Sequence, residues 1–210
     1  MTVKKTIHSA RWILLFLLIL GIGGTVAGEE PLRMVGVNNG FNLQADLNVW
    51  AEKTASYQLY TSGDGLALRL YTGFDRDYLY LGFAVKDPYL TFQDDYSLEF
   101  QQSDHLRVSI FPSAGGQEPV TLYLLPTSKI KEPLFHLSGG SLHRRAVKIH
   151  SVLNKDDYFL AVALSLDELG LTPKTGTKLP LMIVINDLGK DGELRKLSVF
   201  PNDGYGFLAF

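Results

Sequence analysis

Residues 66–85 read LALRLYTGFDRDYLYLGFAV, and this stretch decides the fold. Leucine occupies every second position over residues 66–70, which is the two-residue period of a β-strand with one buried face. A polar run follows at residues 74–77, and the same period returns over residues 78–85. Two such strands joined by a short polar turn form a β-hairpin. The stretch therefore predicts antiparallel β-structure.

The two-residue period continues along most of the chain. Further strands are predicted at residues 105–111, 120–125, 146–153, 158–164, 179–186 and 194–200. Helix is scarce: residues 48–56 hold one candidate turn, and residues 165–169 hold another, capped by Ser165 and ended by Gly170. Many short strands separated by turn residues indicate an all-β fold. We expect a two-sheet antiparallel β-sandwich of the jelly-roll type with one or two short helical turns.

Two of the predicted strands are apolar on both faces. They are the strand at residues 78–85 and the centre of another at residues 181–185. A strand of this kind belongs in the middle of a sheet, where both of its faces are buried. We therefore expect its second face to be covered by another part of the chain or used for binding.

The first residues have the pattern of a secretory signal peptide. Three basic residues and no acidic one occupy residues 1–11, residues 12–20 are apolar without interruption, and small residues follow at 25–28. A signal peptidase would cut after Ala27. The apolar run is shorter than the about 20 residues of a membrane span. Residues 1–27 are thus predicted to be a signal peptide, and an uncleaved N-terminal anchor is the alternative.

The amino-acid composition limits the kinds of partner that this protein is expected to bind. The chain has 210 residues, with 22 acidic against 20 basic residues, a net charge of −2 and no cysteine. Loss of the leader would remove three positive charges, so residues 28–210 would carry −5. We expect these residues to form one domain in the periplasm or outside the cell, with no membrane span once the leader is removed. Its mildly acidic balance argues against a nucleic-acid partner, which requires a basic face.

Several segments, taken in order along the chain, resemble the motifs of family 9 carbohydrate-binding modules (CBM9) and the related DOMON-type domains. The segments are QADLNVW at 44–50, GFDRDYLYLGFAVKD at 73–87, SDHLRV at 103–108, and LSLDELGLTP at 164–173 with VIND at 184–187. The third departs from the family pattern at Arg107, where an acid is usual. The resemblance implies a non-catalytic β-sandwich that holds a sugar between aromatic rings. The family's clamping tryptophans have no counterpart here, because Trp50 belongs to the opening motif.

Other side chains are the candidate ligand-binding residues. In the strand alternation, Tyr78 and Tyr80 lie opposite the leucine face, His105 and Arg107 lie on the outer face of their strand, and Tyr123 is a further aromatic residue in a strand. Aromatic rings stack on the C–H faces of sugars, and planar polar groups orient the hydroxyls. These five residues are therefore predicted to bind a glycan, including an acidic sugar. The alternative is that Tyr78 and Tyr80 pack beneath a covering loop.

Three further residues are expected to be structural. Trp50 offers a large apolar side chain and is predicted to plug one end of the sandwich. Asp46 and Asp104 flank strands, where carboxylates commonly accept hydrogen bonds from loop amides.

Calcium is the one cofactor that the sequence suggests. The loop that starts at Asp187 partly matches the spacing of an EF-hand loop, and the family resemblance implies a structural calcium. Asp94, Asp95 and Asp187 are the candidate ligands. The sequence has neither a G-x-S-x-G nucleophile elbow nor an H-E-x-x-H zinc motif, so we expect no enzyme.

Three functional hypotheses follow. The first is an exported, non-catalytic domain that recognises a glycan or sugar ligand. The second is an accessory module that binds an envelope protein partner or receives an envelope signal, on the same fold. The third is electron transfer by a bound haem, with methionine and histidine side chains as axial ligands.

Overall fold

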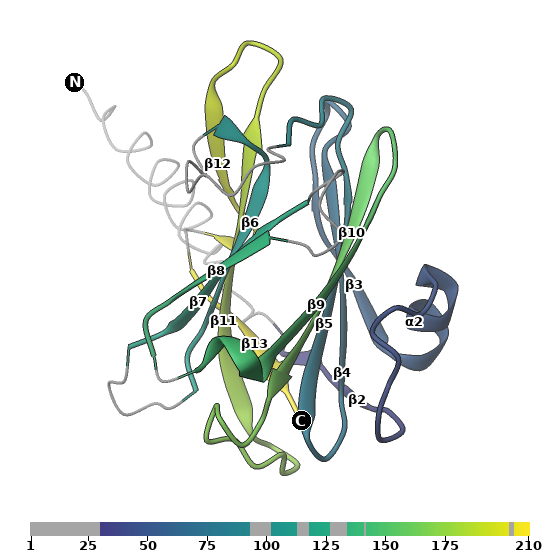
Figure 1. The fold of residues 1–210 in the computed structure, drawn as a ribbon, viewed down its shortest axis with the longest axis vertical. Coiled ribbons are helices and arrows are strands. Elements are labelled where there is room, and N and C mark those ends of the chain that lie inside the picture. The colour runs from purple at the N-terminus through teal and green to yellow at the C-terminus, as the bar shows by residue number, and fades with distance from the viewer. Residues whose placement is uncertain (1–29, 93–101, 113–117, 127–133, 141, 202–203) are drawn as a thin grey trace, which may run out of the picture. The chain divides into compact units, whose positions relative to one another are not determined.

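Two β-sheets packed face to face form the body of the protein (Figure 1). The structure is a computed structural model, and it describes residues 30–92, 102–112, 118–126, 134–140, 142–201 and 204–210. The strands are β1 (Leu32–Arg33), β2 (Val35–Gly36), β3 (Ala55–Thr61), β4 (Ala67–Phe74), β5 (Tyr78–Lys86), β6 (His105–Ile110), β7 (Val120–Leu125), β8 (Leu134–Ser138), β9 (Val147–Leu153), β10 (Asp157–Ser165), β11 (Lys178–Leu188), β12 (Leu194–Ser198) and β13 (Gly206–Ala209). One α-helix, α2 (Leu47–Lys53), and one 3₁₀ turn, η2 (Arg144–Ala146), complete the elements of the described residues.

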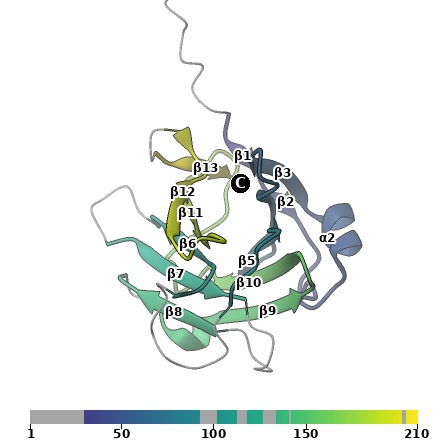
Figure 2. The same cartoon turned by 90° about the horizontal axis from the view of Figure 1, so that it is seen from above.

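The described strands divide into a seven-stranded and a six-stranded sheet, which Figure 2 shows as separate layers. The seven-stranded sheet has the order β1-β13-β11-β6-β7-β8, with β12 also paired to β11. The six-stranded sheet has the order β2-β4-β5-β10-β9, with β3 also paired to β4. The all-β sandwich predicted from the sequence is confirmed. It is not purely antiparallel, because the two-residue pairs β1–β13 and β2–β4 are parallel.

The main core lies between the sheets and comes from the residues that the alternation predicts. In β5 the residues that face the core are Leu79, Leu81, Phe83 and Val85, and each is at most 1% exposed. The opposite sheet contributes alternate residues of β6 and β11, such as Leu106 and Ile183, to the same core. Side chains at the positions between them point to the outer faces of the two sheets.

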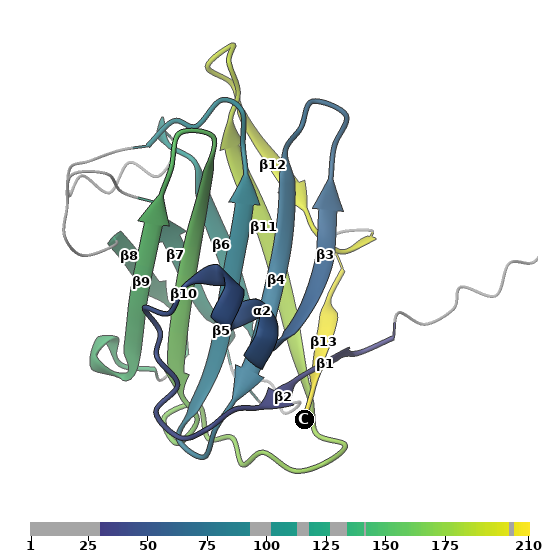
Figure 3. The same ribbon diagram turned by 90° about the vertical axis from the view of Figure 1, so that its right-hand side faces the viewer.

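The outer face of the six-stranded sheet is covered by residues 37–54, which include α2 (Figure 3). Trp50 on α2 is fully buried against this face, with its ring centroid 5.5 Å from that of Phe159 and 4.8 Å from that of Phe41. A second, smaller core results. The expectation that the strand at 78–85 has both faces buried is therefore confirmed. The expectation that Trp50 plugs one end of the sandwich is wrong, because Trp50 packs on the outside of a sheet.

Gly82 in the middle of β5 makes this packing possible. A Cβ atom built on Gly82 would lie 2.9 Å from Cζ of Phe159 and 3.0 Å from Cε3 of Trp50, closer than van der Waals contact allows. Only glycine lets the two rings approach the backbone of the central strand so closely.

The two helical turns predicted from the sequence are both found as turns or helix, with different bounds. The predicted helical turn at 48–56 is found as α2 at 47–53, which begins one residue earlier and ends three residues earlier than predicted. The segment after Ser165 is a hydrogen-bonded turn in which Ser165 Oγ accepts from Glu168 N–H, and Gly170 has a φ of 64°. Residues 1–29, with the predicted leader, lie outside the described residues. No helix of the described residues is long and apolar enough to cross a membrane.

Candidate functional site

The five predicted ligand-binding residues do not lie on one surface. Tyr78 and Tyr80 belong to β5 and face outward on the six-stranded sheet. His105 and Arg107 on β6 and Tyr123 on β7 face outward on the seven-stranded sheet, because the residues between them point into the main core. A single site can therefore include either the two tyrosines of β5 or the other three residues.

Tyr80 is part of the second core. Its side chain is 3% exposed, and its hydroxyl donates a 2.8 Å hydrogen bond to Oδ2 of Asp75. Burial, together with the neighbouring Asp75 carboxylate, raises the pKa of Tyr80. Tyr78 beside it is partly exposed, and the ammonium of Lys148 lies 4.0 Å from the centre of its ring. This arrangement matches the alternative in which the two tyrosines pack beneath a covering segment.

Asp75 is the organising residue of this region, and its role was predicted only as that of a turn residue. Its Oδ1 accepts hydrogen bonds from the N–H groups of Asp77 and Tyr78, each at 2.8 Å. Its Oδ2 accepts from Gly40 N–H at 3.0 Å as well as from the Tyr80 hydroxyl. The carboxylate thus ties the β4–β5 turn to the start of residues 37–54, which we call the covering segment.

On the seven-stranded sheet, aromatic and basic side chains form a continuous row across β6, β7 and β8. Arg107 pairs with Tyr123, and Tyr123 pairs with His136 on the next strand. The ring centroid of Tyr123 lies 6.2 Å from that of His105 and 5.9 Å from that of His136. Arg107, Tyr123 and His136 are all partly exposed.

Two buried nitrogen atoms without hydrogen-bond partners lie on the same face. Three buried side-chain nitrogen atoms lack a hydrogen-bond partner among the described residues: Nε of Arg107, Nδ2 of Asn186 and Nε1 of Trp50. The first two are neighbours, since Asn186 on β11 pairs with His105 two residues from Arg107. Asn186 is only 5% exposed. Leaving such donors unpaired is costly, typically about 1–3 kcal/mol each, so the two on this face favour a ligand that supplies hydrogen-bond acceptors. Asn186 was quoted as part of a family motif but was not predicted as a site residue.

His105 completes this face as a neutral ring. Its Nδ1 donates a 3.0 Å hydrogen bond to the carbonyl of Ser103. Burial lowers the pKa of His105, and the nearby positive charges of Arg107 and Lys196 act in the same direction. We define the outward residues His105, Arg107, Tyr123, His136, Asn186 and Lys196 as the polar face.

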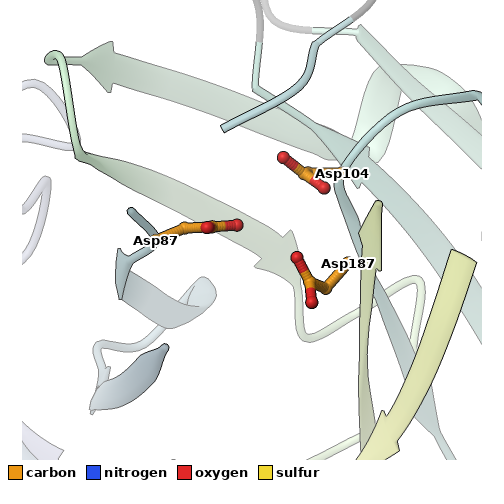
Figure 4. Close-up of side chains that lie close together, drawn as sticks. All are labelled: Asp87, Asp104 and Asp187. Carbon is orange, nitrogen blue, oxygen red and sulfur yellow. The ribbon is translucent and has the colours of Figure 1, made fainter. Parts of the chain in front are cut away.

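A second constellation lies at one end of the sandwich, where Asp87, Asp104 and Asp187 point toward one another (Figure 4). Asp87 follows β5, Asp104 precedes β6 and Asp187 lies in β11, so the cluster joins both sheets. All three are at most 3% exposed, and one carboxylate oxygen from each lies within 4.8 Å of the others. Burial raises the pKa of Asp104 to about 7 and raises that of Asp87. Such an arrangement of oxygen ligands suits a hard divalent cation.

Hydrogen bonds and one ion pair hold the three carboxylates in place. Asp104 accepts from the N–H of Thr91, in a loop, at 2.5 Å and from the N–H of Leu188, at the end of β11, at 2.6 Å. The guanidinium of Arg195 forms an ion pair with Oδ2 of Asp187 and another with Asp64 at 3.0 Å. One guanidinium shared in this way does not balance three buried carboxylates.

The cluster contains one of the three residues predicted as calcium ligands. Asp187 is in the cluster, but Asp94 and Asp95 lie outside the described residues. Asp87 was missed, although it ends the longest of the family-like segments. Asp46 is at the N-cap of α2, where its side chain makes no capping hydrogen bond and its carbonyl accepts from Trp50 N–H at 3.2 Å.

A hollow of about 590 Å³ opens on the outer face of the six-stranded sheet, between the start of α2 and the β9–β10 hairpin. Its lining includes Gln44, Asp46, Arg69, Tyr71, Lys86 and Asp157. None of the five predicted ligand-binding residues lines it. The hollow and the polar face are therefore separate places at which a ligand could lie.

Comparison with known proteins identifies the fold as that of a CBM9-like β-sandwich. A CBM9 from Caldicellulosiruptor kristjanssonii, solved in complex with cellotriose, superposes with a TM-score of 0.62 at 13% sequence identity. The match covers 84% of this chain and 92% of that module. A CBM9 from the same organism in complex with glucose has the same TM-score at 14% identity, over 84% of this chain and 94% of that one. No family model and no curated protein matches the sequence.

Proposed function

We propose that the protein is a non-catalytic carbohydrate-binding domain that recognises a glycan through the polar face of its seven-stranded sheet. The observation that carries this proposal is the pair of buried, unpartnered donors, Nε of Arg107 and Nδ2 of Asn186, on the same face as Tyr123, which is the cross-strand partner of Arg107. Sugar hydroxyls and ring oxygens accept such hydrogen bonds, and the C–H face of a sugar stacks on an aromatic ring. The likeness to modules solved with cellotriose and glucose supports the same class of ligand.

A glycan-array screen of the full chain, followed by calorimetric titration of the glycans retained, tests this function. We expect saturable binding to one glycan class, lost in Arg107→Ala and in Asn186→Ala. Tyr80→Phe is the matched control, because it removes a hydroxyl on the opposite sheet that is already bonded to Asp75. A blank array would overturn the proposal and favour the envelope-protein partner that the sequence also suggests.

We propose, as a second and independent property, that Asp87, Asp104 and Asp187 hold a structural calcium ion. The raised pKa values of Asp87 and Asp104 support it, because they express the cost of burying these negative charges together without a cation. A bound cation would offset that repulsion and stabilise the folded state by mass action.

Thermal unfolding of the full chain with added calcium or with a chelator tests the calcium proposal. We expect calcium to raise the midpoint of unfolding in the wild type and to have no effect in Asp104→Asn. Asp167→Asn, an exposed carboxylate in a turn, is the control that should keep the response. A wild-type midpoint that is the same with calcium and with chelator would exclude a structural ion.

A further inference from the structure

The charged side chains of the polar face are all positive. Arg107 on β6 and Lys196 on β12 are its cations, and both lie close enough to His105 to lower its pKa. The described residues that point outward from β6, β7, β11 and β12 include no aspartate or glutamate. These residues are His105, Arg107, Ser109, Thr121, Tyr123, Leu125, Lys178, Pro180, Met182, Val184, Asn186, Leu188, Leu194, Lys196 and Ser198.

This charge is not a consequence of composition, since the chain has more acidic than basic residues. The carboxylates of the neighbouring strands point elsewhere. Asp187, next to Asn186 in β11, points inward to the acidic cluster, and Arg195, next to Lys196 in β12, turns to the same cluster to pair with it. The alternation of β11 and β12 therefore separates the charges: the acids and Arg195 lie at the end of the sandwich, and Lys196 remains on the outer face.

Neither cation is paired with a carboxylate of the described residues. The buried Nε of Arg107 has no hydrogen-bond partner among the described residues, and Lys196 is exposed and makes no ion pair with a described residue. A guanidinium presents Nε and a terminal nitrogen as two parallel donors, which match the two oxygens of a carboxylate. A neutral sugar would fill only part of this donor capacity.

We propose that the ligand of the polar face is an acidic saccharide, whose carboxylate lies against Arg107 and Lys196 while its ring lies beside Tyr123. The inference rests on the proposed carbohydrate-binding function and names the class of sugar. An acidic saccharide differs from a neutral glucan in one physical respect. Its binding must weaken as salt is added, because it pairs opposite charges at a partly exposed surface.

The test is calorimetric titration of the full chain with trigalacturonic acid and with cellotriose, an acidic and a neutral trisaccharide, at low and at high salt. We expect the acidic trisaccharide to bind more tightly and to lose affinity as salt is added. Arg107→Ala should weaken it by about 10- to 100-fold, as expected for a lost charge-assisted pair. Lys196→Ala should weaken it by about 2- to 5-fold, as expected for an exposed charge.

Control variants show whether a negative result contradicts the acidic class of ligand, the site, or the carbohydrate-binding function itself. Lys196 is exposed, so its variant tests the inference even if Arg107→Ala does not fold. Arg69→Ala removes an exposed cation from the other sheet and should leave affinity unchanged. Equal or tighter binding of cellotriose, still dependent on Arg107, would overturn the acidic class and keep the carbohydrate function. Loss of binding in Arg69→Ala alone would overturn the site, and absence of binding to any glycan would overturn both.

Discussion

Asp75 is a buried carboxylate whose four hydrogen bonds join two parts of the chain. Gly40 belongs to the covering segment, whereas Asp77, Tyr78 and Tyr80 belong to the hairpin beneath it. Burial acts to raise the pKa of Asp75, but the four donors outweigh it, and the pKa is lowered overall. The ionised form of Asp75 therefore stabilises the folded state.

We predict that Asp75→Asn lowers the free energy of unfolding at neutral pH by about 1–3 kcal/mol, since the amide replaces one charged acceptor oxygen with a nitrogen donor. The contribution of Asp75 is present above its unfolded-state pKa of about 3.9 and is lost as the pH falls through the lower folded-state pKa. The difference between wild type and variant should therefore shrink in acid, which urea denaturation at several pH values measures.

The control for this experiment is Asp77→Asn. The side chain of Asp77 is exposed and faces Arg76 within the same turn, so its loss should change stability by much less. A difference between wild type and Asp75→Asn that stays constant down to strongly acidic pH would contradict the assigned role of the carboxylate.

Gly82 offers a second prediction at the scale of one residue. Gly82→Ala should destabilise the protein by about 1–3 kcal/mol, because the added methyl group would collide with the rings of Phe159 and Trp50. Gly63→Ala is the control, since Gly63 is an exposed turn residue with open space at its Cβ position. Chemical denaturation of both variants measures the difference, and equal stability of the two would refute the packing argument.

Among the elements, α2 is too short to be stable by itself. Its seven residues are held by Trp50, its single buried side chain, on the face of the six-stranded sheet. We predict that Trp50→Ala costs about 3–5 kcal/mol, as for other large aromatic side chains removed from a core. Val49→Ala on the exposed side of the same helix should cost much less, because Val49 is 39% exposed. Thermal unfolding followed by circular dichroism compares the two.

The elements that the sequence predicted are those whose alternate side chains pack in the main core. In β4 and β5 one face packs in the main core, so apolar residues recur at every second position. β3 was not predicted as a strand, because it lies at the edge, is at most partly buried, and changes register between Gln58 and Tyr60. The short strands β1, β2, β8 and β13 were also missed, and the two to four residues of β1, β2 and β13 are too few to establish a period.

Prediction of the candidate sites was limited in a similar way, because a local sequence pattern does not show tertiary contacts. Alternation correctly placed Tyr78 and Tyr80 opposite the leucine face, but only tertiary structure shows that residues 37–54 cover them. Asp104 and Asp187 were each named for separate reasons. Their meeting with Asp87 depends on two sheets coming together, and nothing local in the sequence encodes that distance.

At the scale of the whole molecule, the two outer faces differ in what covers them. The six-stranded sheet is covered by a segment of its own chain, in which Nε1 of Trp50 has no partner, whereas the seven-stranded sheet carries the two unpartnered donors of Arg107 and Asn186. This difference in cover is why we propose the second face, and not the first, as the glycan-binding surface.

The predicted signal peptide leads to a prediction about how the full chain is processed. We expect the exported protein to begin at Gly28, which mass spectrometry of the intact protein from the exporting cell would detect. Ala27→Phe should block cleavage, because the peptidase requires a small residue there. Recovery of the uncut chain in the wild type would support the alternative of an N-terminal anchor.

The burial of Trp50 also has an optical consequence. The sequence has two tryptophans, and the other, Trp12, would be lost with the leader. The emission of the mature domain would then come from one indole, sealed between Phe41 and Phe159 on the six-stranded sheet. Release of the covering segment would shift this fluorescence to longer wavelength, whereas a sugar on the opposite sheet would leave it nearly constant. The fluorescence of Trp50 would thus distinguish release of the covering segment from binding of a sugar to the opposite sheet.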